Sequence, residues 1–160
     1  MKRILITGMS GTGKSSVIRA LAERGFKAVD TDSDEWSVWA DDALEPGAGP
    51  DWIWREDRIQ QLLSTEDADL LFVSGCKTNQ RAFYPQFDHI ILLSAPAELI
   101  IERLTTRTTN PYGKDPTELA QVLGYLETVE PLLRRSATLE VETSPPLDEV
   151  VQTILRHVRS

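Results

Sequence analysis

The chain has 160 residues, of which 41% are hydrophobic, enough for the core of one domain and too few for two. Its net charge of −8 and the lack of a basic stripe argue against a nucleic-acid partner, and no stretch approaches the roughly 18 apolar residues of a membrane span. A single cysteine, Cys76, excludes an internal disulfide and suggests a reducing compartment. We therefore expect one cytoplasmic domain over residues 1–160, a monomer or weak homodimer, that acts on neither nucleic acid nor membranes.

The first predicted elements are a strand, a glycine-rich loop and a helix. Residues 3–7 read Arg-Ile-Leu-Ile-Thr, a short buried strand, and we expect no signal peptide because this strand begins so early. Residues 8–15 read Gly-Met-Ser-Gly-Thr-Gly-Lys-Ser, the pattern G-x-x-x-x-G-K-S. Residues 14–24 have apolar side chains at helical spacing and stop at Gly25, as a helix with a C′ glycine does. The sequence therefore predicts a phosphate-binding loop and a nucleoside triphosphate ligand.

The loop residues have separate expected tasks. The glycines let backbone N–H groups converge on phosphates at a helix N-terminus, where the dipole favours anions. Lys14 is expected to reach the β- and γ-phosphates, and the Ser15 hydroxyl to coordinate Mg²⁺. Because a guanine-specifying Asn/Thr-Lys-x-Asp tetrapeptide is missing, ATP is favoured over GTP. The predicted nucleotide-binding residues of the loop are Gly8, Met9, Ser10, Gly11, Thr12, Gly13, Lys14, Ser15 and Ser16.

The rest of the chain alternates between strand-like and helix-like segments, which predicts a parallel sheet with helices on both faces. Further strands are predicted at 27–30, 70–74, 89–93 and 138–142, and further helices at about 34–42, 54–64, 97–106, 117–134 and 147–158. Ligands of such sheets collect at the carboxyl ends of the strands. We therefore expect the phosphate loop, residues 30–34, residues 74–77 and the segment after Leu93 to surround one cleft.

Two carboxylates follow the second strand in Asp30-Thr-Asp32. Phosphoryl transfer needs a carboxylate that holds the metal and often another that orients the acceptor hydroxyl, and this pair suits both tasks. The alternative is an acidic loop that caps the following helix. The third strand ends at Ser74, where many nucleotide hydrolases carry a metal-linked Asp, so the metal task shifts to Ser15 and Asp30. This absence also counts against a motor or AAA-type ATPase.

Arg103 and Arg107 lie four residues apart near the end of a predicted helix and so share one face. The loop that follows contains Pro and Gly, and we expect a lid at about residues 107–116 that brings arginine charge to the transferring phosphoryl group and expels water. The alternative is that both arginines are solvated and pair with neighbouring glutamates.

All four tryptophans fall within residues 36–54, and Arg55 follows at once. They either pack a small helical insert at about residues 33–65, or form an acceptor pocket with aromatic walls and an arginine for an anionic group. Trp52 and Trp54 would not share a face of a helix, so at least one should lie outside the core. Cys76 and Lys77, directly after the third strand, are expected to face the cleft, although a buried structural cysteine is an equal alternative.

With these motifs, the chain resembles the nucleoside-monophosphate-kinase branch of P-loop proteins, adenylate kinase included, and most of all the shikimate and gluconate kinases. Ala28-Val-Asp-Thr-Asp32 matches the shikimate-kinase Asp-x-Asp, whose first Asp serves magnesium and whose second holds the acceptor hydroxyl. Trp54-Arg55-Glu56 is similar to an aromatic-Arg-Glu motif whose Arg binds the acceptor carboxylate. The resemblance implies a three-layer α/β/α P-loop NTPase fold with a five-stranded parallel sheet in the order 2-3-1-4-5.

The resemblance also implies the remaining site residues. Glu102-Arg103-Leu104 and Arg107 look like the helix that enters the lid, with Arg103 flanking adenine and Arg107 reaching the phosphates. Residues 142–146 resemble the loop that closes the other side of adenine, which adds Ser144 and Pro145 to the nucleotide site. The implied catalytic set is Lys14, Asp32 and Arg107. The implied acceptor-binding set is Asp32, Trp54, Arg55, Gly75, Cys76 and Lys77.

The chain departs from its relatives around the acceptor. Shikimate kinases have three glycines after the third strand, where this chain reads Ser74-Gly-Cys-Lys77, and they have a second acceptor-binding Arg where this chain has Val129. Adenylate kinases have a Gly-x-Pro-Arg that is also absent, and Lys77 and Arg81 could supply replacement charge. We expect a kinase that moves the γ-phosphoryl group of ATP–Mg²⁺ to a small-molecule acceptor. The alternative is a nucleotide-dependent regulatory ATPase without such an acceptor, and the acidic charge weakens a third possibility, a kinase of nucleic-acid 5′ ends.

Overall fold

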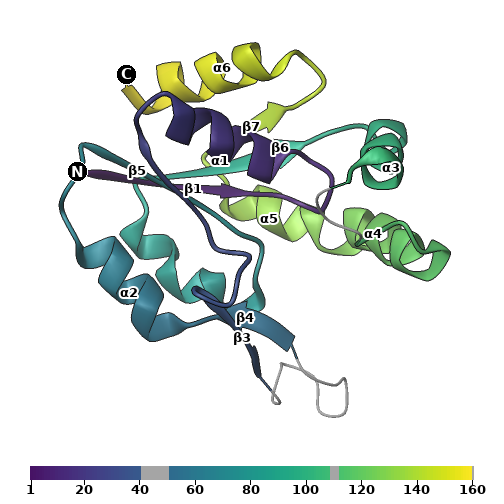
Figure 1. The fold of residues 1–160 in the computed structure, drawn as a ribbon, viewed down its shortest axis with the longest axis horizontal. Helices are drawn as coiled ribbons and strands as arrows, with labels where there is room; N and C mark the ends of the chain where they lie inside the picture. The colour runs from purple at the N-terminus through teal and green to yellow at the C-terminus, as the bar shows by residue number, and fades with distance from the viewer. Residues whose placement is uncertain (41–50, 109–111, 160) are drawn as a thin grey trace.

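A computed structural model describes residues 1–40, 51–108 and 112–159 of the protein. Its centre is a sheet of five parallel strands in the spatial order β2-β5-β1-β6-β7 (Figure 1). The strands are β1 (Lys2–Thr7), β2 (Lys27–Asp30), β5 (Leu70–Ser74), β6 (His89–Ser94) and β7 (Leu139–Glu142). Counted along the chain as the first to fifth parallel strands, they have the order 2-3-1-4-5. The predicted fold class and strand order are confirmed.

The alternation of side chains along each strand builds two hydrophobic layers. In β1, Ile4 and Ile6 point to one face of the sheet and Leu5 to the other. Helices α1 (Lys14–Glu23) and α6 (Leu147–Arg159) pack on the first face, while α2 (Glu56–Ser64) and the 3₁₀ helix η1 (Thr78–Gln86) pack on the second (Figure 1). Since both faces are covered, the inner strands are apolar throughout rather than alternating with polar residues.

Helix α1 ends where the sequence predicts. Gly25 has φ = 91°, its N–H donates to the carbonyl oxygen of Ala22 at 3.0 Å, and the N–H of Phe26 donates to that of Leu21 at 3.1 Å. These two bonds make a Schellman motif, which needs a left-handed residue that glycine supplies without strain. The motif turns the chain directly into β2 and so fixes where Asp30 leaves the sheet.

The predicted helix over residues 117–134 is wrong in its continuity. The structure has two helices there, α4 (Pro116–Thr128) and α5 (Glu130–Ser136). The preceding helix, α3 (Ala97–Thr106), has the predicted bounds. Pro131 explains the break, because its ring removes one backbone N–H and collides with the carbonyl group four residues earlier. Asp115 caps α4, since its carboxylate accepts from the N–H of Thr117 at 2.7 Å.

The predicted helix over residues 34–42 is also wrong within its described part. Residues 37–40 form strand β3 (Ser37–Ala40), which pairs antiparallel with β4 (Asp51–Trp54), while residues 41–42 lie outside the described residues. Cross-strand packing favours the hairpin, because the rings of Trp39 and Trp52 face each other at 5.1 Å between centroids. The helix predicted from residue 54 begins two residues later, at Glu56. The insert is therefore a hairpin followed by a helix.

Candidate active site

The phosphate loop joins β1 to α1 through a close backbone contact at Gly8. A Cβ atom at this position would lie 2.6 Å from the carbonyl oxygen of Leu93 and 2.7 Å from the hydroxyl oxygen of Thr12, and φ is 153°. Thr12 braces the inside of the loop, since its hydroxyl group donates to the carbonyl oxygen of Met9 at 2.7 Å. The glycine is required because the loop runs against the end of β6 with no room for a side chain.

Replacing Gly8 with alanine should lower the free energy of unfolding by about 1–3 kcal/mol, because the backbone of Leu93 cannot yield as a flexible side chain would. Gly124→Ala is the matched control. Gly124 lies in α4 with nothing within 4 Å of its added Cβ, and alanine there should stabilise by up to about 1 kcal/mol. Chemical denaturation of both variants measures the difference. Equal stability of the two variants would contradict the close contact at Gly8.

Lys14 curls back into the loop. Its ammonium group donates to the carbonyl oxygens of Gly8 at 2.6 Å and Met9 at 3.1 Å. Burial lowers the pKa of Lys14, and the neighbouring cation of Lys77 adds to this, while Cys76 and the carboxylates of Asp32 and Asp30 act in the opposite direction. A cation at the N-terminus of α1, enclosed by loop backbone, is the arrangement that binds a phosphate chain.

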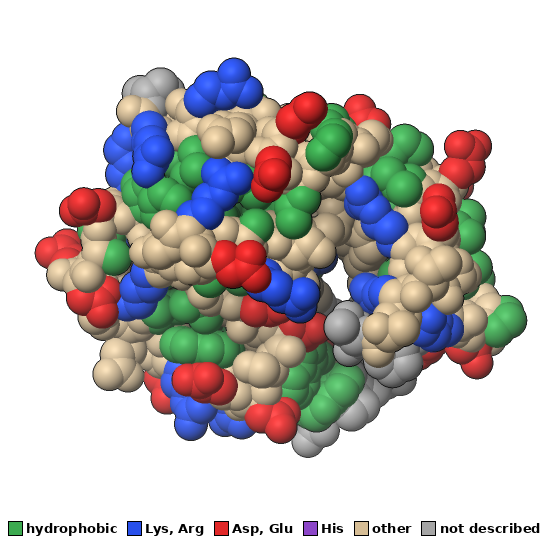
Figure 2. Space-filling model, turned by 45° about the horizontal axis from the view of Figure 1, so that its top comes forward, with side chains coloured by type: hydrophobic (Ala, Val, Ile, Leu, Met, Phe, Trp, Pro, Cys, Tyr) green, Lys and Arg blue, Asp and Glu red, His purple; other side chains and the backbone are tan. Residues whose placement is uncertain are grey.

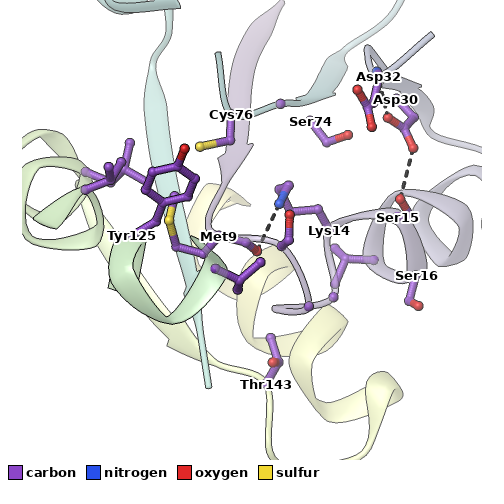
Figure 3. Close-up of a pocket in the computed structure, with 18 of the residues that line it drawn as sticks. Met9, Lys14, Ser15, Ser16, Asp30, Asp32, Ser74, Cys76, Tyr125 and Thr143 are labelled. Atoms are coloured by element: carbon purple, nitrogen blue, oxygen red, sulfur yellow. Dashed lines mark hydrogen bonds between the residues drawn. The ribbon is translucent and has the colours of Figure 1, made fainter. Parts of the chain in front are cut away.

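Ser15 and Asp30 lie together at the end of β2. The hydroxyl group of Ser15 donates to one carboxylate oxygen of Asp30 at 3.1 Å, and the other oxygen accepts from the N–H of Asp32 at 3.0 Å (Figure 3). A hydroxyl and a carboxylate fit Mg²⁺, which typically takes one or two protein carboxylates and completes its shell with phosphates and water. In residues 1–40, 51–108 and 112–159 no group of three or more His, Cys, Asp and Glu side chains could hold a metal, so a cage built of protein alone is not present there.

Asp32 is held by two donors on a single oxygen. The ammonium group of Lys77 and the indole N–H of Trp52 both donate to its Oδ1, each at 2.8 Å. Burial raises the pKa of Asp32, but the hydrogen bond and the charge of Lys77, with Trp52 and Lys14, outweigh burial and leave the pKa below its usual value. The Lys77 side chain is 10% exposed. Asp32 is thus an ionised carboxylate, fixed in direction at the mouth of the phosphate loop.

Replacing Lys77 with methionine should raise the pKa of Asp32. The hydrogen bond and the charge of Lys77, which lower this pKa, are removed, while the burial that raises it remains. Carboxyl ¹³C chemical shifts followed through a pH titration measure this. Lys27→Met is the control: Lys27 pairs at 2.6 Å with Asp67 and lowers the pKa of that carboxylate instead. The control should raise the pKa of Asp67 and leave Asp32 as it is. An unchanged Asp32 titration in Lys77→Met would contradict the assignment of the ion pair.

Arg103 ties the loop to β7. One of its terminal nitrogens donates to the hydroxyl oxygen of Thr143 at 2.8 Å and to the carbonyl oxygen of Gly11 at 3.2 Å, and the other donates to the carbonyl oxygen of Thr143 at 2.6 Å. Thr143 in turn donates to the carbonyl oxygen of Thr12 at 2.8 Å. A terminal nitrogen of Arg107 donates to the carbonyl oxygen of Tyr112 at 2.6 Å. Part of the predicted lid, residues 109–111, lies outside the described residues, and the lid stays a prediction.

These elements enclose a cleft of about 1050 Å³. Figure 2 shows Lys and Arg side chains around a hollow in this part of the surface, and Figure 3 shows the side chains inside. Most predicted site residues line the cleft: Met9, Ser10, Gly11, Gly13, Lys14, Ser15, Ser16, Asp30, Asp32, Gly75, Cys76, Lys77, Arg103, Arg107 and Pro145. The structure brings them together from the loop, the ends of β2, β5 and β7, and helix α3.

Other predicted residues lie outside the cleft lining. Gly8 and Thr12 support the loop from behind, and Ser144 binds the carboxylate of Glu142 at 2.7 Å. Two corrections concern the acceptor. Trp54 lies in the core, fully buried on β4, with its indole N–H donating to the hydroxyl oxygen of Thr31 at 2.7 Å. The guanidinium group of Arg55 donates to the carbonyl oxygen of Asp34 at 2.9 Å and is not part of the cleft wall.

Several lining residues are missing from the sequence-based prediction. Thr143 lies within the predicted adenine loop of residues 142–146 but is not among its predicted site residues, and its contacts with Arg103 and Thr12 reveal its place. Tyr125, Val129 and Leu132 line the cleft from α4 and α5. Their spacing of four and three residues is the spacing of one helix face, and it is the signal that could have found them.

This fold and this site define a P-loop nucleotide-binding protein. The profile of the family described as "AAA domain" matches residues 4–124, and the chain belongs to this family. A shikimate kinase of Pseudomonas putida strain F1 (ATCC 700007) is 28% identical over 172 residues, a match that covers 98% of this chain and 96% of the relative. A protein of Methylobacillus flagellatus named "Nucleotide-binding protein" is 26% identical over 148 residues, a match that covers 90% of this chain and 49% of that protein. The chain thus spans about half the length of this second relative.

The solved structure of a shikimate kinase from Acinetobacter baumannii in complex with shikimate has the same fold. Its TM-score is 0.67, its sequence is 21% identical, and the match covers 99% of this chain and 93% of that one. The resemblance to shikimate kinases, seen first in the motifs, is confirmed in sequence and in fold. In the part of the chain that the structure describes, none of the helices is long and apolar enough to cross a membrane.

The family assignment corrects one prediction. The lack of a carboxylate at Ser74 predicts a protein outside the AAA-type ATPases, whereas the matching family is described as an AAA domain. In the structure, the carbonyl oxygen of Ser74 accepts from the hydroxyl group of Thr31 at 2.6 Å and from its N–H at 3.2 Å. The end of β5 is therefore held by its backbone contacts with Thr31.

Proposed function

We propose that this protein is an ATP-dependent kinase that transfers the γ-phosphoryl group of ATP–Mg²⁺ to a hydroxyl group of a small molecule. The observation that carries this proposal is Asp32, an ionised carboxylate held in place by Lys77 and Trp52 beside the phosphate loop. Hydrolysis by water alone does not need a second carboxylate directed at an acceptor position. The sequence and fold of the shikimate kinases support the same reaction class.

In the proposed reaction, the acceptor hydroxyl oxygen forms a bond to the γ-phosphorus as the bond from that phosphorus to the bridging oxygen of ADP breaks. Asp32 orients the hydroxyl group and takes its proton. Lys14 and Arg107 neutralise the charge on the transferring group, and the N–H groups of the loop hold the phosphates of ATP. Arg103 and the loop of residues 142–146 hold adenine. The loop of this chain fits a phosphate chain, since Gly11, Gly13 and the buried cation of Lys14 line the cleft at the N-terminus of α1.

Magnesium would be held by the Ser15 hydroxyl and by Asp30, which are already hydrogen-bonded to each other. When bound there, Mg²⁺ would supply positive charge to the phosphate oxygens. Asp30 is the last residue of β2 and Ser15 lies in the first turn of α1, so two regular elements set the position of these oxygen atoms.

ATP turnover distinguishes the proposed kinase from the alternative, a regulatory ATPase without an acceptor. The purified protein is given ATP and MgCl₂, with or without the low-molecular-weight filtrate of a cell extract, and ADP release is followed. We expect the filtrate to raise turnover about tenfold or more, because a kinase that excludes water hydrolyses ATP slowly without its acceptor. The filtrate without protein is the control. Equal turnover with and without filtrate would favour the regulatory ATPase.

A further inference from the structure

Exposed apolar side chains gather at the cleft. Among the described residues, the large hydrophobic side chains that are exposed are Trp39 (65%), Leu132 (56%), Tyr125 (44%) and Leu147 (41%). Tyr125, Leu132 and Leu147 line the cleft, and Trp39 packs on Trp52. Scattered apolar residues on a surface need no explanation, but their concentration in one concave site indicates a ligand that covers them. Leu147 follows the loop assigned to adenine, which leaves Tyr125 and Leu132 without an occupant in the proposed function.

Tyr125 and Leu132 belong to a continuous apolar wall, which we define as Met9, Cys76, Tyr125, Val129 and Leu132. All five line the cleft. Met9 is buried in a hydrophobic cluster against which Cys76 and Val129 pack, so the floor of the wall is part of the core. Figure 3 shows Tyr125, Met9 and Cys76 on the same side of Lys14, opposite the carboxylates of Asp30 and Asp32. Met9, Cys76 and Val129 thus form a packed floor, and Tyr125 and Leu132 stand exposed at its edge.

The wall faces the proposed acceptor position across Lys14 (Figure 3). Cys76 belongs to it, and the next residue, Lys77, donates to Asp32 at 2.8 Å. One short turn after β5 thus presents an apolar surface and holds the carboxylate that orients the hydroxyl group. An acceptor whose hydroxyl lies at Asp32 would extend over this turn toward Tyr125 and Leu132.

Among the described residues, the polar side chains near this side of the cleft are bound to other groups or exposed to water. The guanidinium group of Arg55 is bound to the carbonyl oxygen of Asp34, and Thr78 and Asp51 bind each other at 2.6 Å. Of the cations on this side of the cleft, Lys77 is paired with Asp32 at 2.8 Å, and Arg81 and Arg135 are exposed, where water weakens their charges. Hydroxyl groups buried against Val129 and Leu132 would lose hydrogen bonds to water without replacement.

We propose that the acceptor is an alcohol with an apolar body, an aromatic ring or a branched hydrocarbon, which packs between Tyr125, Leu132 and the Met9–Cys76 floor while its hydroxyl group lies at Asp32. This inference rests on the proposed function and specifies the substrate class of the same site. It assigns to Val129 the role of admitting a hydrocarbon at a position where an arginine would bind an acid.

The experiment is a binding titration of the full-length protein with ADP–Mg²⁺ present. Two aromatic alcohols, cinnamyl alcohol and 3-phenylpropan-1-ol, are compared with two polyhydroxylated acids, shikimate and gluconate. We expect the aromatic alcohols to bind more tightly than the acids, and Leu132→Asp to weaken their binding about tenfold or more, since a lost hydrocarbon contact in a pocket is worth about that factor. Thr128→Asp is the matched control. It adds the same charge at an exposed position of α4 that does not line the cleft, and should leave binding as it is.

Tyr125→Ser gives a second test at an exposed position, should Leu132→Asp fold poorly, and it should weaken aromatic binding in the same way. Tighter binding of the acids, no binding of either set, or aromatic binding that neither variant weakens would overturn the inference. Phosphorylation of an acid by ATP would overturn it while supporting the kinase. Aromatic binding that depends on Leu132, together with ATP turnover that no filtrate stimulates, would support the apolar site and contradict the kinase.

Discussion

Replacing Lys14 with alanine is expected to lower the rate of phosphoryl transfer about a hundredfold to a thousandfold and to weaken ATP binding. The ammonium group is the cation nearest the loop backbone, 2.6 Å from the carbonyl oxygen of Gly8, so nothing else in the loop replaces its charge on the phosphates. Its burial lowers the pKa of Lys14, which means that the fold already bears the cost of keeping a cation there. Such a cost indicates a functional position rather than a stabilising one.

The measurements are ATP affinity by calorimetry and turnover by ADP release. Lys27→Ala is the control, since Lys27 pairs with Asp67 away from the phosphate loop, and its loss should change neither quantity. The Lys14 variant should keep its cooperative thermal unfolding, because the lysine binds loop carbonyls rather than core groups. Unchanged affinity and turnover in Lys14→Ala would remove the phosphate-loop assignment.

Replacing Asp32 with asparagine is expected to reduce transfer about a hundredfold to ten-thousandfold and to leave ATP binding intact. Asparagine has the size of aspartate and can keep the hydrogen bond from Trp52, but it cannot accept the acceptor proton as a carboxylate does. The loss should appear in kcat rather than in the affinity for ATP, since the phosphate loop is not altered. Asp67→Asn is the control, because it also removes one carboxylate from an ion pair with a lysine.

The Asp30→Asn variant tests whether Asp30 and Asp32 have separate tasks. It should raise the Mg²⁺ concentration needed for half-maximal turnover, because Asp30 is the carboxylate bound to Ser15. Magnesium titrations of the wild type and of both variants give this comparison. The same magnesium dependence in wild type and Asp30→Asn would contradict the division of tasks between Asp30 and Asp32, and full turnover in Asp32→Asn would contradict the proposed base.

The sheet could be predicted from the sequence because its strands are short apolar segments bounded by clear signals. The strand at 27–30 is placed correctly because Gly25 ends the helix before it. The helix at 97–106 is placed correctly because Pro96 precedes it. The phosphate loop and Asp30 follow from the same logic, because a motif next to a strand end has little freedom of position. Local signals thus determine most of the nucleotide side of the site.

The acceptor side could not be predicted in the same way, because long-range contacts determine it. Trp36 and Trp39 suggest a helix by their spacing, but pairing of residues 37–40 with residues 51–54 overrides this preference. Trp54 belongs to a motif that binds acceptor in similar proteins, yet here it fills the core beside Phe83 at 5.8 Å between ring centroids. Tyr125 and Leu132 line the cleft from two helices, α4 and α5, where the sequence predicts a single helix.

The hydrogen bond from Thr143 to Thr12 joins residues 131 positions apart. It connects the phosphate loop to the residue that directly follows β7. Parallel strand β1 likewise has no partner until residues 70–74 and 89–92 are available. Contacts of such sequence separation form slowly, because the chain must lose the entropy of a long loop before they stabilise it. A nascent chain on the ribosome would therefore carry its complete G-x-x-x-x-G-K-S segment long before that segment could hold a nucleotide. A fragment that ends before Thr143 would lack the contact that braces Thr12, and we expect it to bind nucleotide less tightly than the full chain.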